Sequence, residues 1–183
     1  MSENKTKEIV KIYFQGILGI SFLIALVFVL AGRVDYLEGW IFAFVMICFM
    51  SVTIYFFKDN LDLAKERSKA GKGVKWWDKL LMPFFSIGLY LNVIVGVLDS
   101  GRFFWTEDFP LWFFIVSYIV FIFSLVMFSW PMFVNKWFAK MVRIQKDRDH
   151  QVCKEGPYKY VRHPGYVGAF FMSLSLGMIF SSY

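Results

Sequence analysis

Charged side chains and cysteines are scarce in this chain of 183 residues. Charged residues make up 19% and there are two cysteines, whereas 58% of the residues are hydrophobic. Soluble domains are typically about 45–50% apolar, so a soluble enzyme or a disordered tail fits this composition poorly. Cys48 lies in an apolar run and Cys153 in a polar stretch, so a disulfide-stapled secreted domain fits poorly too. The composition indicates an integral membrane protein.

Five uncharged stretches are candidates for membrane spans. A helix needs roughly 20 mostly apolar residues to cross about 30 Å of hydrocarbon. Four stretches meet this requirement and the fifth only just does, and none alternates with the period of two expected of a barrel strand. The sequence therefore predicts an all-α, polytopic transmembrane helix bundle of about five spans, forming a single membrane domain over residues 1–183. The predicted spans are residues 12–31, 40–57, 80–98, 111–134 and 165–183.

Lysine and arginine are distributed unequally among the connections. Of the 20 basic residues, only Arg33 and Arg102 lie outside the N-terminal tail and the loops 58–79 and 135–164. By the positive-inside rule, we expect the N-terminus and these two loops on the cytoplasmic side. The net charge of +6 then reflects topology and contact with the lipid bilayer, and nucleic acid is not an expected partner.

The first basic loop has the signals of a surface connector. Asp59 or Asn60 can cap a short helix that ends at Ala70, before a glycine. Trp76 and Trp77 follow at the start of the next span, where indole rings favour the membrane interface. The sequence favours a solvated connector with an aromatic anchor. It leaves open the alternative that this loop faces the substrate.

The second basic loop holds both histidines of the chain, His150 and His163. Gly156-Pro157 is a turn signal, and His163-Pro164 favours an extended backbone at His163. Irregular backbone near the hydrocarbon needs hydrogen-bond partners, and a polar ligand at the cytoplasmic interface would supply them. From spacing alone, the nearby tyrosines can equally be interfacial anchors. A two-histidine metal site is not expected, because no suitable third ligand lies nearby.

The string that runs from Arg143-Ile-Gln through His150 to Gly156-Pro-Tyr-Lys-Tyr-Val-Arg-His-Pro-Gly-Tyr-Val-Gly168 is distinctive. It resembles the signature of the isoprenylcysteine carboxyl methyltransferase family, which is related to the phospholipid methyltransferases. The strong match covers residues 143–168, with weaker agreement around Lys65-Glu-Arg and Trp77-Asp-Lys. Within this string, the Gly156–Gly168 segment is far more specific than a lone glycine-rich pattern.

The resemblance implies S-adenosyl-L-methionine as the methyl donor, bound at the cytoplasmic ends of the last helices. It also implies an amphiphilic small-molecule or prenylated acceptor, typically the carboxylate of an isoprenylcysteine, that enters sideways from the lipid. It assigns no catalytic residue, since a carboxylate acceptor needs no general base. By position, the implied cofactor contacts are Gln145, His150, Gln151, Val152, Cys153, Tyr158, His163, Pro164, Gly165 and Tyr166.

Members of this family continue with another apolar helix and a tail that carries arginine and glutamate, whereas this sequence ends at Tyr183. We therefore expect a chain that lacks the usual C-terminal helix and tail. The alternatives are a phospholipid N-methyltransferase, a reductase of the sterol-reductase type and a truncated, catalytically inactive membrane protein. A channel is disfavoured because the predicted spans contain no charged residue. The acceptor and the oligomeric state stay undetermined.

Overall fold

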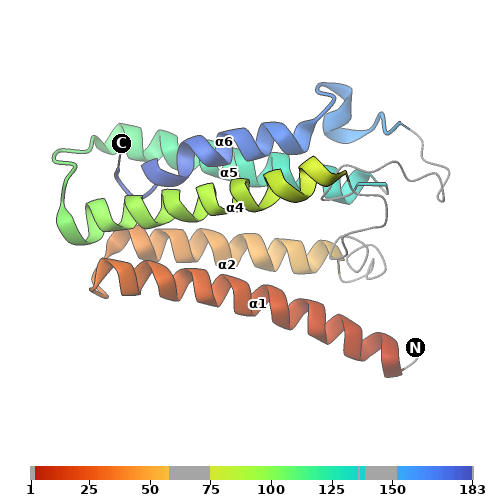
Figure 1. Cartoon of the computed structure of the whole chain (residues 1–183), viewed down its shortest axis with the longest axis horizontal. Coiled ribbons are helices and arrows are strands. Elements are labelled where there is room, and N and C mark those ends of the chain that lie inside the picture. Colours follow the sequence, from red (N-terminus) through yellow and green to blue (C-terminus); the bar gives the residue numbers. More distant parts are fainter. Residues whose placement is uncertain (1–2, 58–74, 136, 139–151, 183) are drawn as a thin grey trace.

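The computed structural model describes residues 3–57, 75–135, 137–138 and 152–182. Within these ranges the chain is helical and contains no strand (Figure 1), so the predicted all-α bundle is confirmed. The predicted short helix that ends at Ala70 lies outside the described residues. The elements are α1 (Glu3–Ala31), α2 (Leu37–Phe57), α4 (Trp76–Val97), η1 (Leu98–Phe103), α5 (Leu111–Val134), η3 (Gly156–Lys159) and α6 (Pro164–Met178).

Four helical segments of the described chain are long and apolar enough to cross a membrane. They are Tyr13–Ala31, Leu37–Phe57, Trp76–Phe103 and Leu111–Val134. The third differs from the predicted span 80–98, because helix α4 already begins at Trp76 and continues beyond Leu98 as the π-helix η1. The helical segment therefore includes charged residues that the prediction placed in the loops, among them Asp78 and Asp99.

Helix α6 is shorter than the predicted span 165–183. Its 15 residues extend over about 22 Å, against a hydrocarbon core of about 30 Å. The helix ends because the chain turns at Ile179–Ser181 back into the bundle, where Ile179 and Phe180 are fully buried. The ring of Phe180 packs against those of Tyr36 and Phe42, with centroids 6.5 and 5.1 Å apart. The prediction continued the last helix past Met178, whereas the chain there forms a turn that is buried in the bundle.

The helices lie roughly parallel along the long axis of the molecule, with α4, α5 and α6 on one side of α2 and α1 on the other (Figure 1). The start of α4, the end of α5 and the start of α6 lie at one end, which we call the loop end. The α1–α2 and α4–α5 connections lie at the opposite end, together with the end of α6. The segment Gly156–Gly168 of the signature begins at the loop end.

Helix α6 packs closely on α5 and crosses α4 near its own C-terminus. A Cβ placed on Gly96 of α4 would lie 3.2 Å from the carbonyl oxygen of Gly177, so the two backbones nearly touch. Asn92 of α4 donates a hydrogen bond from Nδ2 to the carbonyl of Ser173, at 3.0 Å. From Leu80 to Leu91, in contrast, most of α4 is exposed. The two helices thus diverge toward the loop end.

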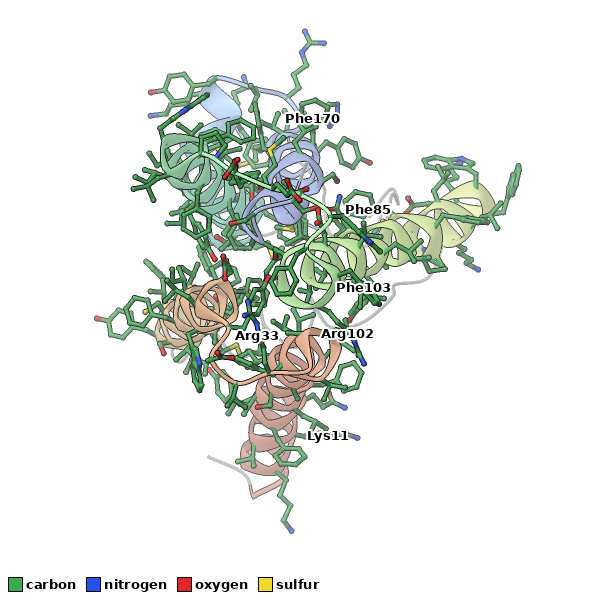
Figure 2. The ribbon with its side chains drawn as sticks, turned by 90° about the vertical axis from the view of Figure 1, so that its left-hand side faces the viewer. Lys11, Arg33, Phe85, Arg102, Phe103 and Phe170 are labelled. Carbon is green, nitrogen blue, oxygen red and sulfur yellow. The ribbon has the colours of Figure 1, made fainter. Side chains whose placement is uncertain are left out.

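Opposite the loop end, a buried carboxylate joins three parts of the chain. Asp99 of η1 accepts hydrogen bonds from the backbone N–H and the Oγ1 of Thr106, both at 2.6 Å. It also accepts one from Oγ of Ser182, at 2.6 Å, and the side chain of Asp99 is only 4% exposed. Figure 2 views this end, where Arg33 and Arg102 are labelled. These bonds hold the C-terminal turn against the α4–α5 connection.

Candidate functional site

The signature segment is anchored to the end of α5 by its first glycine. Gly156 has a φ of +55°, which L side chains rarely adopt. A Cβ at this position would lie 3.1 Å from Nε1 of Trp130 and 3.1 Å from Cγ2 of Val134. Pro157, the next residue, is fully buried. The predicted Gly-Pro turn is confirmed, and it starts the short helix η3 directly on α5.

Helix α6 begins at Pro164, directly after His163, whose φ of −131° and ψ of 65° lie outside the helical region. The prediction of an extended backbone at His163 is wrong, because this ψ lies well below the extended range of about 120–160°. Proline is well suited to the first helical position, since it has no N–H to satisfy there. The carbonyl of His163 accepts hydrogen bonds from the N–H groups of Tyr166 and Val167, at 3.1 and 3.3 Å. The predicted break at His163-Pro164 is therefore the start of the last helix.

Asn135, which the sequence analysis did not single out, links the signature segment to α5. It is the first residue after the helix, and its Nδ2 donates a hydrogen bond to the hydroxyl oxygen of Tyr158, at 3.0 Å. Its Oδ1 accepts a hydrogen bond from the N–H of Trp137, also at 3.0 Å. An asparagine directly after a predicted helix is the only sequence signal that points to such a role.

The ring of Phe138 lies next to Gly165, in the first turn of α6. A Cβ placed on Gly165 would be 3.6 Å from Cε2 of Phe138, an ordinary van der Waals distance. The N–H of Phe138 is bonded to the carbonyl of Asn135, at 3.0 Å. The short segment after α5 thus contacts Tyr158 of η3 and places the Phe138 ring beside Gly165 of α6.

The structure places seven of the ten predicted cofactor contacts and brings several of them to the start of α6. Gln145, His150 and Gln151 lie outside the described residues. Tyr158, Cys153 and Gly165 are half-buried and Pro164 is buried, whereas Val152, His163 and Tyr166 are exposed. The rings of His163 and Tyr166 stack with centroids 5.6 Å apart and an interplanar angle of 28°. The described residues leave both rings uncovered.

The first turn of α6 carries a partial positive charge from its backbone N–H groups. The N–H groups at a helix N-terminus point away from the helix and favour an anion. Those of Tyr166 and Val167 are bonded to the carbonyl of His163. Among the described residues, no acceptor is found for the N–H of Gly165. This end of α6 therefore has a donor in a position that suits a carboxylate.

The fold and this junction define a multi-pass integral membrane protein with a proline-initiated helix at the loop end of its bundle. Residues 114–183 match the model of the isoprenylcysteine carboxyl methyltransferase (ICMT) family. The matched segment contains α6, η3 and nearly all of α5, and it supports membership of that family. The match indicates a membrane methyltransferase. Comparisons with curated proteins and with solved structures gave no match.

Proposed function

We propose that this protein transfers a methyl group from S-adenosyl-L-methionine to an amphiphilic acceptor, with the carboxylate of an isoprenylcysteine as the favoured substrate. The observation that carries the proposal is the junction of η3 and α6, where the family match and the Gly156–Gly168 signature coincide. The donor supplies a methyl group bound to a positively charged sulfur.

The residues at the junction fit the groups of such a donor. The N–H of Gly165, for which the described part of the chain supplies no acceptor, suits its carboxylate, since a helix N-terminus stabilises negative charge. The stacked rings of His163 and Tyr166 offer an aromatic surface for a purine. Tyr158 presents a hydroxyl that Asn135 holds in place. The remaining proposed contacts are Gln145, His150, Gln151, Val152, Cys153 and Pro164.

Methyl transfer to a carboxylate requires few chemical groups from the protein. An acceptor oxygen forms a bond to the methyl carbon as the bond from that carbon to sulfur breaks, which yields a methyl ester and a neutral thioether. No proton has to be removed from a carboxylate, so a general base is unnecessary. The contribution of the chain is to align the two reactants and to exclude water from them.

The acceptor's apolar tail has a surface available beside the junction. Phe170 of α6 is 60% exposed, one turn beyond Tyr166 on the same helix face. Phe85, on the exposed part of α4, lies on the same side of the bundle (Figure 2). We place the loop end in the cytoplasm because the flanking basic segments favour that side. The tail would then stay in the hydrocarbon while the head group reaches the loop end.

A transfer assay tests the proposal and separates its alternatives. The purified protein in lipid nanodiscs receives methyl-labelled donor together with a prenylcysteine, a fatty acid or phosphatidylethanolamine. We expect a base-labile methyl ester on the prenylcysteine, and at least a tenfold lower rate for His163→Ala, the effect of about 1.4 kcal/mol. Val34→Ala, an exposed change at the opposite end, should leave the rate unchanged.

Other outcomes of the same assay contradict the proposal. Label on the amine of phosphatidylethanolamine would identify a phospholipid N-methyltransferase. Absence of transfer to every acceptor, from a protein that still unfolds cooperatively, would favour an inactive membrane protein.

A further inference from the structure

The side chain of Asn135 is fixed at both of its polar atoms. Its Oδ1 accepts from the N–H of Trp137, and its Nδ2 donates to the hydroxyl of Tyr158. A backbone N–H can only donate, so Oδ1 has to face Trp137 and the NH₂ group has to face Tyr158. The amide orientation is thus dictated by the backbone. Tyr158 therefore receives its hydrogen bond from a group that cannot rotate away.

Asn135 lies at a point where three elements meet. It follows the last residue of α5, its amide reaches η3, and its carbonyl binds the N–H of Phe138, whose ring contacts Gly165 at the start of α6. One short segment therefore holds Tyr158 by a hydrogen bond and places an aromatic ring beside Gly165, two of the proposed cofactor contacts. Asn135 itself lies outside the signature string, which begins at Arg143.

We propose that Asn135 is a positioning residue of the methyl-donor site. It acts through Tyr158, whose hydroxyl it anchors to the end of α5, and it fixes the distance between η3 and α6 at which the donor binds. This inference rests on the proposed function, since it assigns Asn135 to that same site. Loss of the amide would remove the hydrogen bond that ties the Tyr158 hydroxyl to the end of α5, so the hydroxyl would be less well placed for the donor.

Donor binding, measured by calorimetry in nanodiscs without acceptor, tests this role. A single hydrogen bond contributes about 1 kcal/mol, so we expect Asn135→Ala to raise the dissociation constant of S-adenosyl-L-methionine about fivefold. Tyr158→Phe removes only the hydroxyl oxygen and should have a similar effect. The double variant should bind no more weakly than either single variant, because both changes remove the same bond.

A matched control separates positioning from a general loss of stability. Asn92 also donates a hydrogen bond to a backbone carbonyl across helices, but midway along the bundle, at Ser173. Asn92→Ala should lower the midpoint of thermal unfolding and leave donor affinity unchanged. Asn135→Ala should weaken binding with a smaller change in that midpoint.

The outcomes distinguish this inference from the proposed function. If the unaltered protein binds the donor and both Asn135→Ala and Tyr158→Phe bind it equally well, the positioning role is wrong and the proposed function stands. Additive losses in the double variant would likewise overturn the role, since the residues would then act independently. No binding by the unaltered protein would overturn the proposed function and this inference together.

Discussion

Gly168 of α6 lies directly against the backbone of Phe128 in α5: a Cβ at Gly168 would be 2.6 Å from the Phe128 nitrogen. Real Cβ atoms essentially never approach backbone so closely, so the two helices could keep their separation only with glycine here. The last glycine of the signature is thereby explained as a packing residue. It brings α6 close enough to α5 for the segment after α5 to reach Gly165.

Replacement of Gly168 by alanine should push α6 away from α5. Overpacking of this kind typically costs about 1–3 kcal/mol, and we expect a lower midpoint of thermal unfolding in detergent. Gly88→Ala is the matched control, because the space around Gly88 in α4 is open. An unchanged midpoint for Gly168→Ala would show that the two helices are not packed as described.

The carboxylate of Asp99 should be important for stability at the end opposite the loops. Asp99→Ala leaves the hydroxyls of Thr106 and Ser182 without their acceptor, and we expect a loss of about 1–3 kcal/mol. Ser182→Ala should cost less, since it removes one bond of three. The exposed Asp35→Ala serves as control. Equal unfolding midpoints for Asp99→Ala and Asp35→Ala would contradict the three-bond arrangement.

Tyr36 should make the fold sensitive to alkaline pH. Burial is the main cause that raises the pKa of Tyr36 above its ordinary value, while its hydroxyl lies 2.6 Å from that of Ser100. Above a pH of about 10 the unfolded chain loses this proton and the folded chain keeps it, so stability falls as the pH rises. In Tyr36→Phe, the alkaline decline in unfolding midpoint should be shallower than in the unaltered protein. Parallel pH profiles of the two proteins would contradict this assignment.

The proposed orientation can be tested with the native Cys153. It is half-buried near the loop end, while Cys48 faces the surroundings of α2 and is removed as Cys48→Ser. A membrane-impermeant maleimide should label Cys153 in inverted vesicles and not in sealed vesicles of native orientation. A cysteine at exposed Asp35 should give the reverse pattern. Labelling of Cys153 from the outer side would invert the proposed topology.

Local signals in the sequence were sufficient to predict the helical bundle and the turn at Gly156-Pro157. The turn at Gly156-Pro157 and a break in the helix before Pro164 follow from the conformational limits of glycine and proline, and α6 begins one residue before the predicted 165. Apolar length alone could not show that α6 ends at Met178, because the turn that follows depends on the burial of Phe180 among other helices.

Contacts between distant residues were beyond the reach of that reasoning. Asp99 resembles any loop carboxylate until Ser182, 83 positions away, is seen to donate to it. Asn135 and Tyr158 are 23 positions apart, and no periodicity links them. The predicted donor contacts came from a resemblance and stay predictions.

Photolabelling tests the central claim most directly. Ultraviolet irradiation of the protein in nanodiscs with methyl-labelled S-adenosyl-L-methionine is followed by digestion and peptide mapping, with excess unlabelled donor as competitor. The account predicts saturable label confined to peptides from residues 145–166, reduced in Tyr158→Phe and His163→Ala. Label that does not saturate, or that appears near Arg33 and Asp99 at the opposite end, would contradict a donor site at the start of α6.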